Sequence, residues 1–304
     1  MGKILVIGAT GFVGAHLVQA LLQAGHTVRC LARNPDRIRD MAGKDCEIVK
    51  GDILDPESLR KALESIDAAY LCIHTLTAQQ GKGSDYGFMD IEIEGLKNVV
   101  DGCKAAGVKR LIYLTSLGIS PDSTNTWTRE RWKAEQFLFQ SRLNVTTIRP
   151  GQIVGKGGHG FDGMIAQAKR RLAVVIGSGS QLWRNIALDD LLYYMIGVLD
   201  DARTYGQSYE VGCDDILSYN QMIDVAADVL GKQHPLKVTL PTTLILMLAP
   251  LVERSGRLSK GALEGLFGGG KIDMVGNPVP IRAILPRPPM SYRLAIERAL
   301  RTEG

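Results

Sequence analysis

The chain has 304 residues, of which 45% are hydrophobic and 22% charged, a composition typical of a globular protein with a sizeable core. Its net charge of +4 is mild and no long basic run occurs, so charge does not indicate a nucleic-acid partner. The five cysteines and five histidines are scattered, without CxxC or HExxH spacing. This scatter argues against a metal site and favours a reduced, cytoplasmic chain.

The first half of the chain alternates short apolar runs with longer helical patterns. Strands are predicted in KILVIG, TVRCLAR, CEIVKGD, AAYLCIH, KRLIYLTS and NVTTIRP. Helices are predicted between them, in GFVGAHLVQALLQAGH, at residues 89–106 and at residues 128–141. Repeated strand–helix alternation predicts an α/β fold, with a doubly wound parallel sheet covered by helices on both faces.

After Pro150 the pattern changes to a smaller C-terminal lobe. GQIVGKGGHGFDG is predicted to be a loop, followed by a helix at residues 164–171, the strand AVVIG and a helix at residues 188–199. Further on, the segment from residue 206 to 232 predicts strand, turn, helix and glycine cap, and YRLAIERAL predicts a last helix. We expect one domain at residues 1–150 and a second at 151–304, with a segment around 184–200 returning to the first.

The longest uncharged stretch is VTLPTTLILMLAPLV, from Val238 to Val252. It has 15 residues and two prolines, whereas a membrane-spanning helix needs roughly 20 apolar residues. We expect a helix that is buried in the fold or covered by another subunit. An apolar lid over a ligand pocket, or a contact with a membrane surface, is the alternative.

The segment GATGFVG places Gly8, Gly11 and Gly14 between a predicted strand and a predicted helix. In that context Gly8 permits a tight turn, and Gly11 lets a pyrophosphate approach the positive N-terminus of the helix. Gly14 allows the helix to pack closely on the strand. The loop therefore predicts a dinucleotide site, although a glycine-rich turn without a ligand has the same spacing.

The end of the second predicted strand indicates which dinucleotide binds. NAD-binding units usually place Asp or Glu there, to bind the ribose 2′-hydroxyl. This chain has Arg33 at that point and Arg37 one helical turn later. A guanidinium matches a 2′-phosphate in charge and geometry, so NADP(H) is favoured over NAD(H). A solvated arginine, with Asp36 turned inward, is the alternative.

GATGFVGAHLVQALLQAGHTVRCLAR, KGDILDPESLRKAL, KRLIYLTSLG and TIRPGQIVG, in this order, resemble the short-chain dehydrogenase/reductase superfamily. More narrowly, nearly the whole chain resembles its atypical, NmrA-like and complex-I-subunit-like branch. The resemblance implies a Rossmann fold with a C-terminal substrate lobe. It also implies further cofactor contacts from Thr10, Phe12, Val13, Asp52, Ile53, Ile73, His74, Thr75, Thr115, Pro150, Gly151 and Ile153.

In oxidoreductases of this superfamily, a tyrosine four residues before a lysine transfers the proton, and a serine after the fifth strand orients the substrate. Ser116 and Lys133 match the serine and the lysine, but Arg129 occupies the tyrosine position. Lys133 can still bind the nicotinamide ribose. The proton would then come from water, from Lys133 itself, or from Tyr86 or His74.

Three functions remain open. The leading one is an NADP(H)-dependent reductase of a small, largely apolar substrate, whose pocket the stretch after Val238 could line. The second is a non-catalytic NADPH-binding sensor or regulator that binds a protein partner. The third is an accessory or assembly factor of a membrane complex. The fold does not choose among them, because one fold hosts many functions.

Overall fold

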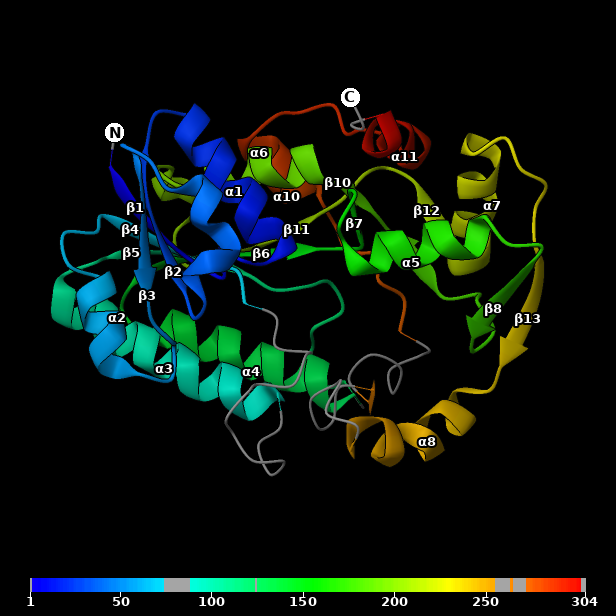
Figure 1. Ribbon diagram of the computed structural model, residues 1–304, viewed down its shortest axis with the longest axis horizontal. Helices are drawn as coiled ribbons and strands as arrows, with labels where there is room; N and C mark the ends of the chain where they lie inside the picture. Colours follow the sequence, from blue (N-terminus) through cyan, green and yellow to red (C-terminus); the bar gives the residue numbers. More distant parts are fainter. Residues whose placement is uncertain (1, 74–87, 124, 255–262, 265–271, 302–304) are drawn as a thin grey trace. The chain divides into compact units, whose positions relative to one another are not determined.

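The computed structural model describes residues 2–73, 88–123, 125–254, 263–264 and 272–301 (Figure 1). The chain folds as two compact units that interleave along the sequence. Unit 1 contains residues 1–115, 130–148 and 192–208, and unit 2 contains residues 116–129, 149–191 and 209–304. These units are defined by contacts alone. The division into a cofactor domain and a substrate lobe therefore stays a prediction.

A seven-stranded sheet has the order β11-β6-β5-β4-β1-β2-β3. The pairings among β1 to β6 are parallel, as the alternating sequence pattern predicts. The strands are β1 Lys3–Ile7, β2 Thr27–Ala32, β3 Cys46–Lys50, β4 Ala68–Leu71, β5 Arg110–Leu114, β6 Asn144–Pro150 and β11 Gln207–Val211. The chain order reverses at β1, which lies between β2 and β4, and in such sheets the ligand crevice lies at that reversal.

Helices cover both faces of this sheet, with α1 and the end of α6 on one face and α2, α3 and most of α4 on the other (Figure 1). Their bounds are α1 Phe12–Gln23, α2 Pro56–Ala62, α3 Phe88–Ala106, α4 Thr126–Gln140 and α6 Leu188–Gly197, with a 3₁₀ helix, η1, at Pro35–Met41 and another, η2, at Ala202–Thr204. The predicted doubly wound fold is confirmed, and the predicted helices at 89–106, 128–141 and 188–199 lie within two residues of α3, α4 and α6.

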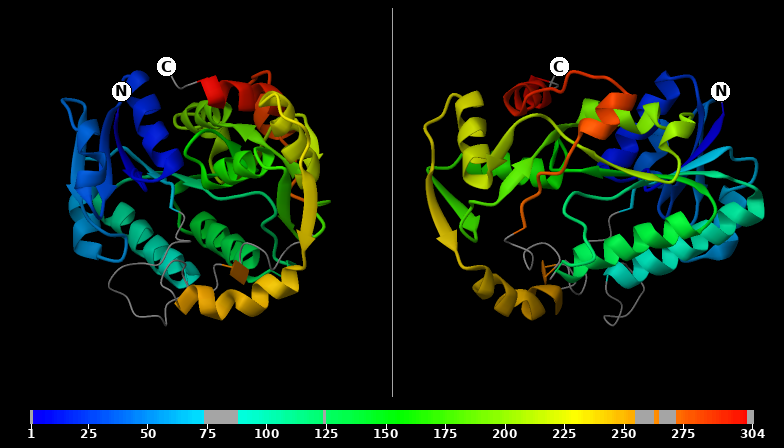
Figure 2. Two further views of the ribbon diagram at one scale, coloured as in Figure 1. Left: turned by 45° about the vertical axis from the view of Figure 1, so that its right-hand side comes forward. Right: turned by 180° about the vertical axis from the view of Figure 1, so that it is seen from behind.

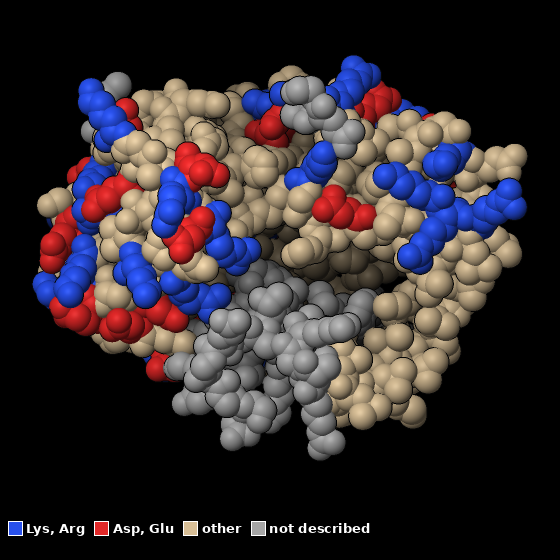
Figure 3. Space-filling model, in the orientation of Figure 1, with Lys and Arg blue, Asp and Glu red and all other residues tan. Residues whose placement is uncertain are grey.

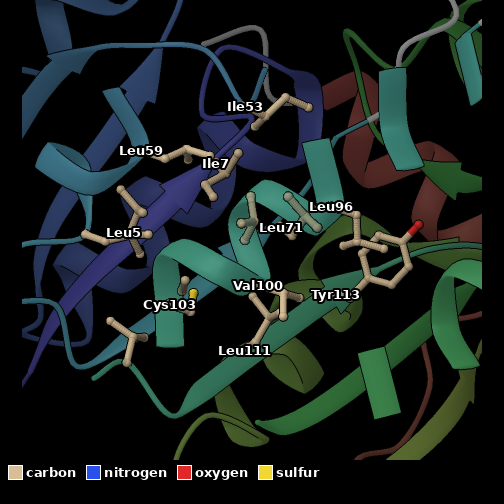
Figure 4. Close-up of a cluster of buried hydrophobic side chains, with 14 of the residues drawn as sticks. Leu5, Ile7, Ile53, Leu59, Leu71, Leu96, Val100, Cys103, Leu111 and Tyr113 are labelled. Atoms are coloured by element: carbon tan, nitrogen blue, oxygen red, sulfur yellow. The ribbon is translucent and has the colours of Figure 1, made fainter. Parts of the chain in front are cut away.

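The core beneath α2, α3 and α4 follows from the two-residue period of the strands. Leu5 and Ile7 of β1 point to this face, together with Leu71 of β4 and Tyr113 of β5 (Figure 4). The helices contribute Leu59, Leu96, Val100 and Cys103. The strands therefore read as continuous apolar runs because both of their faces are covered.

Two buried arginines donate hydrogen bonds to carbonyls at helix C-termini. They lie at the edge of the sheet where β2 and β5 begin. Arg29 Nη1 donates to the carbonyls of Ala62 (2.9 Å) and Glu64 (2.8 Å) at the end of α2. Arg110 Nε donates to the carbonyl of Leu199, 2.8 Å away, just after α6. The last carbonyls of a helix have no partner within the helix, so these guanidinium groups satisfy them.

A buried ion pair joins α3 to α4. Arg131 is 1% exposed, and its Nη2 lies 3.1 and 2.9 Å from the two carboxylate oxygens of Glu92. Four residues later on α4, the buried carboxylate of Glu135 accepts a hydrogen bond from Ser208 Oγ. The sequence pattern did not reveal these pairs, because their members lie far apart along the chain.

Unit 2 has its own core between α5 His159–Ala168, α7 Tyr219–Val229 and α11 Tyr292–Arg301 (Figure 2). Two-stranded sheets join β7 Ile153–Val154 to β10 Ile186–Ala187, β9 Leu182–Arg184 to β12 Ile216–Ser218, and β8 Leu172–Ile176 to β13 Leu236–Leu240. Helix α8 is Thr242–Arg254 and α10 is Val279–Ile284.

One expectation for unit 2 is wrong, and another is wrong in part. Helix α5 begins at His159, inside the predicted glycine-rich loop, because Phe161 is buried in the core and Asp162 accepts a hydrogen bond from the Gly157 N–H. The stretch from Val238 to Val252 is not buried in the fold, since Leu244, Met247 and Leu251 are 45–77% exposed, and its cover by another subunit stays a prediction. None of the helices in the described ranges has the length and apolar character needed to cross a bilayer.

The Arg131–Glu92 pair makes a prediction about stability. We expect Arg131→Ala to lower the free energy of unfolding by about 3–5 kcal/mol, because the substitution leaves the buried Glu92 carboxylate without its cation. The matched control is Arg60→Ala, which breaks exposed ion pairs with Glu57 and Glu64 and should cost less than about 1 kcal/mol. Urea unfolding followed by circular dichroism measures both. Equal losses would contradict the assignment.

Candidate functional site

The turn after β1 lies against the end of β4, at the reversal point of the sheet. Gly8 has φ +92°, and a Cβ added to it would lie 2.4 Å from the carbonyl oxygen of Cys72. Gly14 is equally crowded, since its Cβ would lie 2.1 Å from the Gly8 carbonyl oxygen. Both positions therefore require glycine for reasons internal to the fold. This matches the roles predicted for a turn and for close helix packing.

Gly11 differs from the other two glycines of the loop. It is exposed, it is the N-cap of α1, and an added Cβ would meet only the Gly8 carbonyl oxygen, at 3.3 Å. No side chain among the described residues caps this helix, and its first turn has no acid. The N–H groups that begin α1, at Phe12 and Val13, are thus suited to binding an anion.

The loop after β2 carries the two predicted phosphate-binding arginines. Arg33 and Arg37 are exposed, and neither makes an ion pair or side-chain hydrogen bond within the described part of the chain. Asp36 does not compete for them, because its Oδ1 lies 2.5 Å from Arg39 Nη2. The loop thus presents two cations whose charge no described acid offsets.

Asp52 and Ile53, which follow β3, contact other parts of the protein. Asp52 Oδ1 accepts the Leu54 N–H at 3.0 Å and so forms a local turn. Ile53 is buried in the core, where a Cβ on Gly95 of α3 would lie 2.2 Å from Ile53 Cδ1. Contact of these two residues with a cofactor stays a prediction.

Ile73 and Thr115 follow β4 and β5. Ile73, just after β4, packs partly buried against the core. Thr115, just after β5, is buried and its N–H donates to the Ile148 carbonyl at 2.9 Å. His74, Thr75 and Tyr86 lie outside the described residues.

Lys133 and Arg129 lie one turn apart on α4. Lys133 is 57% exposed, and its Nζ pairs with Glu130 Oε1 at 2.8 Å. Arg129 Nη1 donates to the Ser123 carbonyl at 3.0 Å. The position of the superfamily tyrosine is therefore held by a guanidinium, which does not lose its proton in proteins.

Tyr113 does not replace the missing tyrosine. It lies on β5, two residues before Thr115, but its side chain is buried. Burial raises the pKa of Tyr113 to about 12, and the Arg131 guanidinium only partly opposes that rise. A hydroxyl with this pKa in the core is poorly placed and poorly matched for proton transfer near neutral pH.

The remaining predicted residues belong to unit 2. Ser116 Oγ is buried and has no hydrogen-bond partner among the described residues. The Leu117 N–H donates to the Pro150 carbonyl at 2.8 Å. Gly151 is packed so closely that an added Cβ would overlap the Arg184 carbonyl oxygen, and Ile153 pairs in register with Ile186 of β10. Their contact with a cofactor stays a prediction.

One candidate was not singled out from the sequence. Asn185 is 1% exposed, and neither its Oδ1 nor its Nδ2 has a partner among the described residues. Buried amides normally satisfy both groups, so this side chain is suited to a polar ligand group. Its neighbours are close to the Gly151 segment, since the Ile186 N–H donates to the Gln152 carbonyl at 3.0 Å. An isolated asparagine in the sequence gives no signal of such burial.

Comparison with known proteins shows the family of the chain. Residues 8–171, just over half of the chain, match the NAD(P)H-binding family. The chain belongs to that family. The match confirms the dinucleotide-binding family expected from the glycine loop, and it is consistent with the short-chain dehydrogenase/reductase resemblance.

Two of the curated relatives that the chain matches have different kinds of names. The chain is 32% identical over 170 residues to sterol demethylase protein B of Methylococcus capsulatus, covering 50% of this chain and 51% of that protein. It is 32% identical over 147 residues to the photosystem II assembly factor Ycf39 of Cyanophora paradoxa, covering 48% and 44%. The chain therefore spans about half the length of these two relatives.

Among solved structures, the chain resembles the NADPH-dependent quinone oxidoreductase QOR2 of Escherichia coli, which was solved with NADPH. The TM-score is 0.71 at 20% identity, over 99% of this chain and 100% of that one. At this identity the likeness shows the fold alone.

The glycine loop makes the second prediction. We expect Gly11→Val to weaken dinucleotide binding at least about tenfold, because the side chain would occupy the space of the pyrophosphate. The protein should still fold, since Gly11 has φ −86° and ψ 167°, a conformation that valine adopts readily. Gly43→Val is the matched control, because nothing lies within 4 Å of an added Cβ there. Calorimetric titration with NADPH measures the affinity of both variants. Unchanged affinity in a folded Gly11→Val variant would mean that the loop is only a turn and does not bind the dinucleotide.

Proposed function

We propose that the protein is an NADP(H)-dependent reductase of a small, largely apolar organic substrate. The observation that carries the cofactor preference is the loop after β2, where Arg33 and Arg37 have no described acid to pair with and Asp36 is taken by Arg39. A 2′-phosphate would supply the missing negative charge. The name of the sterol demethylase relative supports an apolar substrate. The cysteines form no disulfide, and from this we infer a cytoplasmic location.

Each part of the site has a proposed task. The open N-terminus of α1 at Gly11 holds the pyrophosphate, and Arg33 with Arg37 holds the 2′-phosphate. Lys133 holds the nicotinamide ribose through its ammonium group, and Ser116 orients the substrate through its hydroxyl, which has no hydrogen-bond partner among the described residues. When bound, the dinucleotide supplies hydride.

The absence of the tyrosine limits this reaction. An alkoxide that forms on the substrate must take a proton, and Arg129 does not provide one at neutral pH. Water, Lys133, Tyr86 and His74 are the remaining proton sources. Lost general acid catalysis typically costs about 10²–10⁴-fold, so we expect slow turnover of ordinary carbonyl substrates.

The same observation favours a second candidate function, a non-catalytic NADPH-binding sensor or regulator with a protein partner. Such a protein would bind the cofactor through the same residues. It would need no proton donor, so Arg129 at the tyrosine position would have no effect on its function. The name of the photosystem II assembly factor supports a related accessory role at a membrane complex. The two candidates differ in whether NADPH is consumed.

The third prediction tests cofactor choice. We expect Arg33→Ala to weaken NADPH binding roughly ten- to a hundredfold while NADH binding changes little, because a charge-assisted hydrogen bond contributes roughly 1.5–3 kcal/mol. Fluorescence titration with both cofactors measures this. Arg60→Ala, another exposed arginine of unit 1, is the control and should change neither affinity. Equal affinity of the unmodified protein for NADPH and NADH would remove the argument.

The fourth prediction separates the two candidate functions. With NADPH and a panel of quinones and aldehydes, the reductase should consume NADPH in stoichiometric amounts, and Lys133→Ala should slow that consumption at least about tenfold. Lys104→Ala, an exposed lysine of α3, should not. The sensor would bind NADPH tightly without consuming it.

Arg129→Tyr extends the same test. A gain in carbonyl reduction would show that the rest of the site is assembled for catalysis. No gain in a variant that still binds NADPH, together with no turnover by the unmodified protein, would favour the sensor.

A further inference from the structure

Helix α8 carries an apolar stripe along its exposed side. Leu244, Met247, Leu248, Leu251 and Val252 are 38–77% exposed. Their spacing is i, i+3, i+4, i+7 and i+8, which places them on one side of a helix. Single exposed apolar residues are common on protein surfaces, but a contiguous stripe of this kind marks an interaction site.

The adjacent sheet extends the stripe. Leu236 and Val238 of β13 alternate with Lys237, so they point to the same face, and Leu236 is in register with Leu172 of β8. Leu172, Leu236 and Val238 are 47%, 69% and 39% exposed. We call these three residues and the five of α8 the apolar face. It lies entirely within unit 2.

Basic residues border this apolar face without acids among them. Lys169, Arg170 and Arg171 are exposed and make no ion pair within the described part of the chain, and the Leu236 N–H donates to the Arg171 carbonyl at 3.0 Å. The sequence has no Asp or Glu from residue 229 to residue 252. In Figure 3 the lower right, over α8 and β13, shows neither red nor blue side chains, and Lys and Arg side chains border it from above.

The nearest acids of α7 are already paired. Asp224 binds Lys237 at 2.5 Å, and Asp228 lies 2.8 Å from His234 and 2.9 Å from Arg293. The cations at residues 169–171 therefore have no described carboxylate to offset them.

We propose that the apolar face docks on the surface of a bilayer that contains anionic lipids. Apolar side chains enter the boundary between headgroups and acyl chains, and a basic border is drawn to anionic headgroups. A second copy of the chain fits less well, because a symmetric contact would bring this face against itself, with cations on both sides and no acids to meet them. Helix α8 has only 13 residues, so it would lie in the interface plane and not cross it.

The experiment is co-sedimentation of the full chain with large unilamellar vesicles, either of phosphatidylcholine alone or with phosphatidylserine added. We expect binding to the anionic vesicles that is weakened at high salt and is at least about tenfold weaker on neutral vesicles. The double variant Met247→Asp/Leu251→Asp should lose binding at least about tenfold. The triple variant Lys169→Glu/Arg170→Glu/Arg171→Glu should lose it on anionic vesicles.

The matched control is Val279→Asp on α10, a residue of unit 2 that is 65% exposed, as Leu251 is. It should bind vesicles like the unmodified chain. NADPH titration of every variant serves as the folding check and also keeps this proposal separate from the proposed function. A variant that loses vesicle binding but keeps NADPH binding supports the docking surface, whether or not the protein is a reductase.

Three results would overturn the proposal. They are absence of vesicle binding by the unmodified chain, equal binding to neutral vesicles, and equal loss in Val279→Asp. Sedimentation velocity tests whether a second copy of the chain occupies the apolar face instead. If the unmodified chain is a dimer that does not bind vesicles, and Met247→Asp/Leu251→Asp makes it a monomer, the apolar face would be a dimer interface.

Discussion

Backbone crowding between β1, α1 and β4 is the constraint on which the site depends. The Gly8 carbonyl lies where a Cβ on Gly14 would be, and Gly8 itself lies against the Cys72 carbonyl. Only glycine permits this approach, which brings the start of α1 to the reversal point of the sheet. The parallel order then places the residues that follow β2, β3 and β5, such as Arg33, Asp52 and Thr115, at the same edge.

Arginine has two different tasks in unit 1, and burial distinguishes them. At the edge where strands begin, Arg29 and Arg110 are buried, and each donates to carbonyls at or just after the end of a helix. At the edge where strands end, Arg33 and Arg37 are exposed and have no described partner. The first pair stabilises the fold, whereas the second keeps its charge available to a ligand. The sequence alone shows four similar arginines.

The fold could be predicted from periodicity because each strand of β1 to β6 is a short apolar run and each long helix has one apolar side. Two failures have physical reasons. The many glycines from residue 151 to 163 predicted a loop, whereas α5 begins at His159 because Phe161 is buried in the core. Apolar content predicted that α8 is covered by the fold or by another subunit, and the fold does not cover it. Hydrophobicity indicates that a segment gains free energy by leaving water, but it does not indicate what covers the segment. In the site, the glycine and arginine motifs were visible locally, whereas Asn185 and the Arg131–Glu92 pair depend on contacts that no local pattern contains.

Helix α4 contains no tyrosine, and a small rotation cannot bring another of its side chains to the tyrosine position. Residues 129 and 133 share one side of a helix, while 131 and 135 share another. Arg131 and Glu135 are buried and bonded to Glu92 and Ser208, which fixes the rotation of α4 about its axis. Turning the helix to present a different side chain would leave buried charges unpaired, at a cost of several kcal/mol. The chemistry beside Lys133 is therefore determined by residue 129, and Arg129→Tyr changes that chemistry without disturbing the buried pairs that orient the helix.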